Sequence, residues 1–170
     1  MRIPLIAGNC KMFKTVAEAT ATVQHLGRLL ADVTGVDVVV APTFTALHAA
    51  AQAASGTRIG IAGQNLHWER EGAFTGEISG GMLKEAGASW VLIGHSERRA
   101  LFGETDLGVN RKIGAAFASS LTPIVCIGET LDQRERNETF DVLDGQIRQG
   151  LESLTGDQLI RLVLAYEPVW

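Results

Sequence analysis

The chain has 170 residues, which is enough for one domain with a real hydrophobic core. Its residues are 46% hydrophobic and 20% charged, and its net charge of −4 argues against nucleic acid and against an anionic membrane as partners. No apolar run approaches the roughly 20 residues needed to span a membrane. The two cysteines, Cys10 and Cys126, form no CxxC pair. We therefore expect neither a disulfide framework nor a zinc site, and we expect a cytoplasmic location.

Six short, nearly continuous apolar runs predict β-strands, at 3–7, 36–41, 58–62, 90–93, 123–127 and 161–166. Strands of this composition are usually buried on both faces, as in parallel sheets. The segments between them carry helical spacing, and Thr15 with Glu18 forms a capping-box pattern at the start of the first. Further helices are predicted at 44–54, around 82–86, from 105 to about 117, and as one helix from 130 to about 151.

Strands and helices alternate, which predicts a parallel α/β sheet with right-handed crossovers. An open doubly wound sheet and a closed eight-stranded barrel both fit that order. Polar residues follow nearly every strand. They are Asn9, Lys11, Thr43, Gln64, Asn65, His95, Ser96, Glu97, Glu129, Thr130 and Glu167. Because a barrel gathers all of these positions at one face, we favour the barrel. No GxGxxG or GxxxxGKS/T motif follows the first strand, which weakens a nucleotide-binding interpretation.

Four segments, in order and at matching spacing, resemble the triosephosphate isomerase family. They are AGNCKM at 7–12, GAFTGEIS at 72–79, IGHSERR at 93–99 and AYEPVW at 165–170, with weaker matches at 63–65 and 126–129. The resemblance implies a (β/α)8 TIM barrel, which needs about 250 residues and eight strands. With six predicted strands, residues 1–170 are expected to form a single incomplete barrel domain, truncated after the sixth strand.

The resemblance also implies an activity, the interconversion of dihydroxyacetone phosphate and D-glyceraldehyde 3-phosphate in glycolysis and gluconeogenesis. Glu167 matches the general base that moves a proton between adjacent carbons through an enediolate, and Pro168 biases it toward extended backbone. His95 matches the neutral imidazole that donates a hydrogen bond to the substrate oxygen, with Ser96 able to begin a short helix. A helix N-terminus disfavours a positive imidazolium, which is why the resemblance implies a neutral ring. No metal and no organic cofactor are implied.

Further residues match supporting positions. Lys11 offers a positive charge to a small phosphorylated triose and to its developing oxyanion, and Asn9 can hold an oxygen or position Lys11. Glu97 and Ser96 are expected to support the site. The resemblance implies a homodimer of the full-length enzyme, with Thr75 on a loop that reaches the neighbouring site. The other histidines, His25, His48 and His67, are expected to be structural.

The chain departs from the family pattern beside the site, with Cys10 where a Trp is usual and Phe13 where an Asn is usual. These changes affect local packing and remove no reacting group. The resemblance implies a lid that begins at Pro168 and continues past residue 170, followed by two further strands that bind the phosphate. We therefore expect the isolated chain to be inactive or nearly so. Two alternatives stay open: a non-catalytic barrel remnant that self-associates or needs a complementing segment, and another phosphosugar barrel enzyme such as a lyase or synthase.

Overall fold

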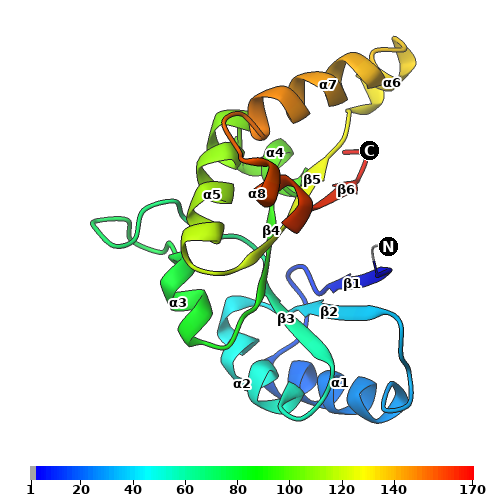
Figure 1. The fold of residues 1–170 in the computed structure, drawn as a ribbon, viewed down its shortest axis with the longest axis vertical. Helices are drawn as coiled ribbons and strands as arrows, with labels where there is room; N and C mark the ends of the chain where they lie inside the picture. The colour runs from blue at the N-terminus through cyan, green and yellow to red at the C-terminus, as the bar shows by residue number, and fades with distance from the viewer. Residues whose placement is uncertain (1–2) are drawn as a thin grey trace.

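The computed structural model describes residues 3–170, which form a six-stranded, wholly parallel sheet in the order β1-β2-β3-β4-β5-β6 (Figure 1). The strands are β1 (Leu5–Asn9), β2 (Asp37–Ala41), β3 (Ile59–Gly63), β4 (Trp90–Ile93), β5 (Thr122–Ile127) and β6 (Val163–Tyr166). Each strand pairs with the next one along the chain. This is the arrangement that consecutive βα units produce.

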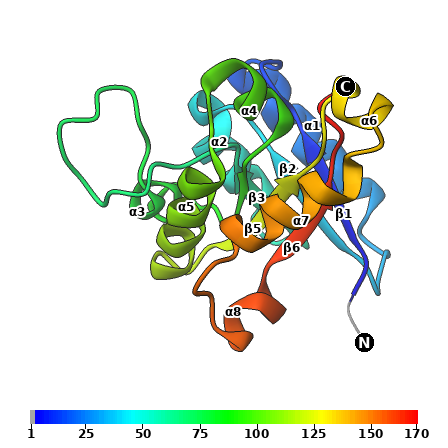
Figure 2. The same ribbon diagram turned by 90° about the horizontal axis from the view of Figure 1, so that it is seen from above.

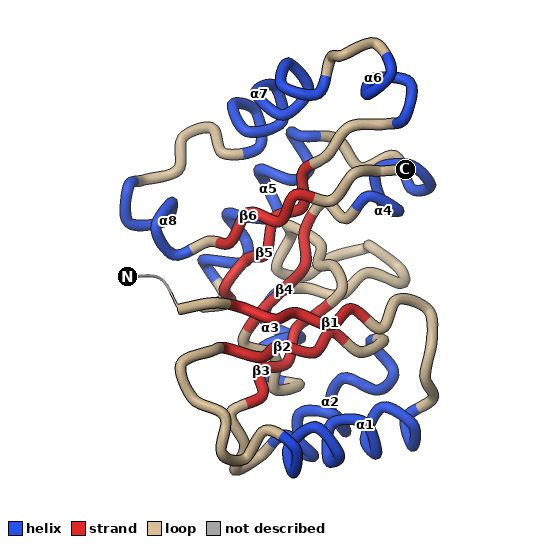
Figure 3. Tube along the Cα trace, turned by 90° about the vertical axis from the view of Figure 1, so that its right-hand side faces the viewer, coloured by secondary structure: helices blue, strands red, loops and turns tan. Residues whose placement is uncertain are grey.

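Eight helices occur among residues 3–170. They are α1 (Val16–Leu29), α2 (Phe44–Ala54), α3 (Gly80–Glu85), α4 (Ser96–Phe102), α5 (Asp106–Ala118), α6 (Leu131–Glu135), α7 (Thr139–Gly150) and α8 (Gly156–Arg161). The expected capping box at Thr15 and Glu18 is present at the start of α1. In Figure 3 the strands form a curled half-barrel, and α1 and α2 lie along one end of it with α6 and α7 at the other.

The sheet separates two apolar cores, which is why its strands are apolar on both faces. Along β2, Val39 and Ala41 belong to the inner core with Leu92 and Ile124, while Val40 belongs to the outer core beneath the helices. This alternation follows the two-residue period of a strand. The inner core is the filled interior of a βα barrel, and the predicted barrel architecture is confirmed in its first six strands.

The prediction of one helix from 130 to about 151 was wrong, because two helices occupy that stretch. The helix opened by Thr130 ends after one turn, and Asn137 adopts a left-handed φ of 60° before α7 begins. Asparagine tolerates this conformation better than most residues. Helix α8 was not predicted, although Thr155 and Gln158 form a capping box at its start. Since α8 includes Arg161, β6 begins two residues later than expected.

The two edge strands, β1 and β6, carry exposed apolar side chains on their outer faces. Ile6 on β1 is 62% exposed and Leu164 on β6 is 41% exposed. On the inner strands of the sheet, residues that point outward in the same way are covered by helices, and Val40 on β2 is an example. The segment 64–79 projects as a long loop, which Figure 2 shows extending away from the helices.

Candidate active site

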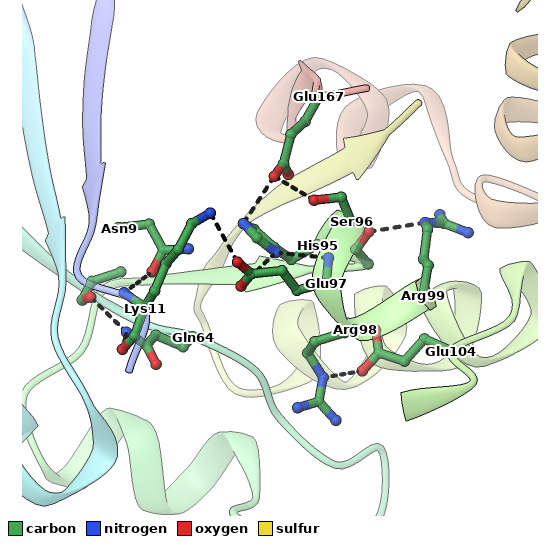
Figure 4. A network of polar contacts seen from close by, with 12 residues as sticks. Asn9, Lys11, Gln64, His95, Ser96, Glu97, Arg98, Arg99, Glu104 and Glu167 are labelled. Carbon is green, nitrogen blue, oxygen red and sulfur yellow. Dashed lines mark hydrogen bonds and ion pairs between the residues drawn. The ribbon is translucent and has the colours of Figure 1, made fainter. Parts of the chain in front are cut away.

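The predicted site residues lie at the carboxyl ends of three strands. Asn9 ends β1 and Lys11 follows it, His95 comes two residues after β4, and Glu167 directly follows β6. Parallel strands bring these ends to the same face of the sheet. Figure 4 shows the side chains of His95 and Glu167 meeting one another, with Lys11 and Glu97 alongside.

The imidazole of His95 is held in a single tautomer by its neighbours. His95 is the N-cap of α4, and its Nδ1 accepts a hydrogen bond of 3.2 Å from the backbone N–H of Glu97. Because Nδ1 accepts in this hydrogen bond, Nε2 is the ring nitrogen that can donate. Nε2 lies 3.0 Å from Oε1 of Glu167, and Nδ1 lies 3.6 Å from Oε2 of Glu97. The imidazole is buried, with 9% of the side chain exposed.

The carboxylate of Glu167 receives two donors. Besides Nε2 of His95, the Ser96 hydroxyl donates to Oε1 at 2.6 Å. Burial acts to raise the pKa of Glu167, but the hydrogen bonds from His95 and Ser96 outweigh it and lower the pKa to about 2. The backbone N–H of Glu167 donates to the Ile127 carbonyl at 2.8 Å and so continues the β5–β6 ladder by one residue. Glu167 is therefore ionised at neutral pH and tied to the residue expected to polarise the substrate.

Lys11 lies across from this pair on a tight, exposed turn. Its backbone adopts a φ of 50°, and its N–H donates to Oδ1 of Asn9 at 2.9 Å. Its ammonium group contacts Oε1 of Glu97 at 2.9 Å, and the hydrogen bond that it donates to that carboxylate raises the pKa of Lys11. Gln64, which the motif analysis did not include in the site, holds the turn by donating from Nε2 to the Lys11 carbonyl at 2.8 Å.

A cleft of about 350 Å³ opens between these groups. Its polar wall is formed by Asn9, Lys11, Gln64, His95 and Glu97. Met12, Phe44 and Phe102 also line the cleft, and their side chains are 91%, 39% and 67% exposed. The lining does not include Glu167, whose carboxylate is turned toward His95 and Ser96.

The structure does not bring Thr75 to these residues. Thr75 is exposed on the projecting loop, where the neighbouring Phe74 folds back so that its ring lies 4.3 Å from that of His67. His67 in turn accepts from the Glu69 N–H through Nδ1 at 3.1 Å. His67 is thus a structural residue of this loop, as the sequence analysis expected.

Known proteins are similar to this chain in both sequence and fold. The family model for triosephosphate isomerase matches residues 4–170. The chain belongs to the triosephosphate isomerase family. Proteins of that name from Citrifermentans bemidjiense and Trichlorobacter lovleyi are 55% and 54% identical over 170 residues, which is all of this chain and 68% of each relative. The crystal structure of triosephosphate isomerase from Bartonella henselae superposes with a TM-score of 0.91 at 38% identity, over 99% of this chain and 69% of that one.

A buried ionic cluster of Glu104, Lys112 and Arg98 lies near His95, and the sequence motifs gave no sign of it. Glu104 accepts from both Lys112 and Arg98, and Lys112 also donates to Oδ1 of Asn65 at 2.7 Å. Burial alone would raise the pKa of Glu104, but the bonds from Lys112 and Arg98 outweigh it and lower the pKa. The cluster joins the segment after α4 to the end of β3. The sequence could not predict this cluster, because Glu104 and Asn65, which both bond to Lys112, are 39 positions apart in the chain.

The ends of β4 and β5 are joined by Arg99. Its guanidinium donates to the Gly94 carbonyl at 2.9 Å, to Oδ1 of Asp106 at 2.7 Å and to the Cys126 carbonyl at 3.3 Å. Burial, followed by the charge of Glu167, raises the pKa of Cys126 to about 12. The Cys126 thiol is therefore protonated at neutral pH and packs as a small apolar group.

The segment after Glu167 is anchored on Glu129, which is fully buried. Its carboxylate accepts from the Tyr166 hydroxyl at 3.0 Å and from Nε1 of Trp170 at 3.4 Å, and its carbonyl accepts from the Val169 N–H at 2.8 Å.

Residues 3–170 contain no group of three or more His, Cys, Asp or Glu side chains arranged to hold a metal ion. Within that same range, no helix is both long and apolar enough to cross a membrane.

Proposed function

We propose that this site interconverts dihydroxyacetone phosphate and D-glyceraldehyde 3-phosphate by proton transfer through an enediolate. One observation carries the proposal. Nε2 of His95 lies 3.0 Å from Oε1 of Glu167, while Nδ1 of the same ring accepts from the Glu97 N–H. A hydrogen-bond donor and an ionised carboxylate in contact, beside a lysine, form the set that proton abstraction next to a carbonyl requires.

Glu167 acts as the base once substrate separates it from His95. While it accepts from His95 and Ser96 its pKa is about 2, and a carboxylate in that state is a weak base. A substrate carbonyl that takes over the Nε2–H, in a site from which water is excluded, removes a donor from the carboxylate and raises its basicity. Glu167 then takes the proton from the carbon next to the carbonyl and returns it to the former carbonyl carbon, while the hydroxyl proton on the first carbon passes to the former carbonyl oxygen.

His95 and Lys11 stabilise the charge that this transfer creates. When the carbon loses its proton, electrons move to the carbonyl oxygen, which accepts the hydrogen bond from Nε2 of His95. Lys11 supplies a positive charge within the same cleft, and Asn9 holds the turn that presents it. Glu97 supports both groups, since its N–H fixes the His95 tautomer and its carboxylate contacts the Lys11 ammonium.

We further propose that residues 1–170 form a single incomplete barrel domain with little isomerase activity by themselves. The position of β1 and β6 at the two ends of the sheet supports this proposal, because a strand paired on one side only leaves backbone groups open to other chains, and Ile6 and Leu164 add exposed apolar surface there. A homodimer of the full-length enzyme is supported by the exposed side chains of Met12, Phe13 and Phe102 and by the projecting loop that carries Thr75.

The free thiols of Cys10 and Cys126 support a reducing cytoplasmic location.

A coupled assay with either triose phosphate tests the function. The 170-residue chain is compared with a chain completed by the C-terminal third of the Trichlorobacter lovleyi relative. We expect the completed chain to turn over substrate, and Glu167→Gln or His95→Gln to reduce its rate by about 100-fold or more, the usual contribution of a general acid or base. A completed chain that folds but does not turn over substrate would favour the non-catalytic remnant. Full activity of the 170-residue chain would refute the proposed dependence on a closed barrel.

A further inference from the structure

Glu167 is placed by its backbone as well as by its side-chain partners, and its carbonyl lies against Gly128. A Cβ added to Gly128 would lie 2.0 Å from the Glu167 carbonyl oxygen, 2.6 Å from its carbonyl carbon and 3.0 Å from Cα of Pro168. These distances are far inside van der Waals contact, and two of the three involve the Glu167 peptide itself. Whatever holds the Gly128 peptide therefore also limits where the backbone of Glu167 can lie.

The Gly128 peptide is held by one side chain, that of Gln146 on α7. The Gly128 N–H donates to Oε1 of Gln146 at 2.8 Å, and Nε2 of Gln146 donates to the Gly128 carbonyl at 2.9 Å. A carboxamide carries one acceptor and one donor group on a single plane, so it pairs with both polar groups of a residue as a neighbouring strand would. Gly128 directly follows β5 and is buried, where unpaired backbone groups are unfavourable.

We infer that Gln146 is a positioning residue for the reaction: by clamping the Gly128 peptide, it fixes the backbone of Glu167 so that the carboxylate meets Nε2 of His95. This inference rests on the proposed function, in which Glu167 is the base. Gln146 is not among the residues that line the cleft, and its carboxamide pairs with the backbone of Gly128. Its effect passes through Gly128 alone.

A purely structural role for Gln146, as an attachment of α7, makes a different prediction. Helix α7 has a second attachment, because Nδ2 of Asn110 on α5 donates to the Gly150 carbonyl at 3.1 Å and to the Glu152 carbonyl at 2.9 Å. Substituting Asn110 loosens α7 without removing a partner of Gly128. Asn110→Leu is therefore the control for helix attachment. Gln149→Leu, on the exposed side of α7, is the control for the substitution itself.

The test uses the completed chain labelled with ¹⁵N-histidine, and its readout is an NMR signal, so that it does not depend on turnover. The NMR signal of the His95 Nε2–H is assigned by its loss in His95→Gln. In Gln146→Leu we expect the proton signal to move upfield and to exchange with water roughly tenfold faster, about the factor that one ordinary hydrogen bond supplies. Asn110→Leu and Gln149→Leu should leave both properties unchanged.

An unchanged signal in Gln146→Leu, or an equal change in Asn110→Leu, would overturn the inference. If Gln146→Leu does not fold, Gln146→Glu replaces it, since a glutamate keeps an acceptor for the Gly128 N–H but sets a carboxylate oxygen, which cannot donate, against the Gly128 carbonyl. The expected direction of change and the contradicting results are the same. The proposed function fails separately, if Glu167→Gln or His95→Gln in the completed chain retains the full isomerase rate.

Discussion

The two halves of the sheet organise their functional side chains differently. At the ends of β4 and β6, His95 and Ser96 both contact the Glu167 carboxylate directly, with at most about a third of the His95 or Glu167 side chain exposed. At the end of β1, Lys11 is 46% exposed and sits on a turn that the Gln64 amide holds from the next strand but one. The reacting pair is thus pre-arranged by the chain itself. Lys11 is held mainly through its backbone, and its ammonium group contacts the carboxylate of Glu97, which is equally exposed.

This difference predicts where substitutions will be costly. The second half contains buried charges and buried hydrogen bonds, which are expensive to leave unpaired. The first half contains exposed groups, whose contacts are weakened by solvent.

The largest expected effect is the loss of stability in Glu104→Ala. The side chain of Lys112 is 6% exposed, and removal of Glu104 leaves its ammonium without a counter-charge. Breaking a buried ion pair in this way costs about 3 kcal/mol or more. Chemical denaturation should show this decrease in the free energy of unfolding. Glu135→Ala, at an exposed position of α6, is the control. A decrease in Glu104→Ala no larger than in the control would contradict a structural role for the cluster.

The second prediction concerns pH and Glu167. Its pKa in the folded chain is about 2, below the ordinary value of 4.5. A depressed carboxyl pKa stabilises the fold above the unfolded pKa, and this stabilisation is lost as the pH falls from there toward about 2. We expect Glu167→Gln to remove about 1 to 2 kcal/mol of the acid dependence between pH 5 and pH 2, allowing for partial exposure. Stability curves against pH measure it. An unaltered curve would show that Glu167 is not held by His95 and Ser96.

The third prediction concerns the backbone of the first half. Gln64→Leu removes the hydrogen bonds from Nε2 to the carbonyls of Lys11 and Ala41. We expect a loss of about 1 kcal/mol in the free energy of unfolding and faster amide exchange in the Lys11 turn. Gln52→Leu, exposed on α2, is the matched control. If amide exchange in the turn is the same in both variants, the turn does not depend on Gln64.

The smallest expected effect on stability comes from Lys11→Met. The side chains of Lys11 and Glu97 are 46% and 45% exposed, and such pairs contribute less than about 1 kcal/mol. Stability should hardly change, whereas binding of glycerol 3-phosphate by the completed chain should be lost or strongly weakened. Lys14→Met, another exposed lysine close by, should affect neither property. Equal binding by Lys11→Met and Lys14→Met would remove Lys11 from the proposed site.

The sequence allowed much of the fold to be predicted, because the signals for strands and caps are local. Six apolar runs predicted the six strands, and the capping box at Thr15 predicted the start of α1. The break near Asn137 was missed because helical spacing continues on both sides of it. The structure brings His95, Glu167, Lys11 and Asn9 to one face, as the strand-end positions indicated. The motifs gave no sign of the pairings of Glu104 with Lys112 or Gln146 with Gly128, which join residues on different elements.

The central claim is that Glu167 and His95 act on the same carbon skeleton, one as base and one as hydrogen-bond donor. Solvent deuterium incorporation into dihydroxyacetone phosphate, followed by proton NMR in D₂O with the completed chain, measures that proton transfer directly. We predict deuterium at the carbon that loses its proton, and a rate lowered by about 100-fold or more in both Glu167→Gln and His95→Gln. Incorporation at an undiminished rate in either variant would contradict the account.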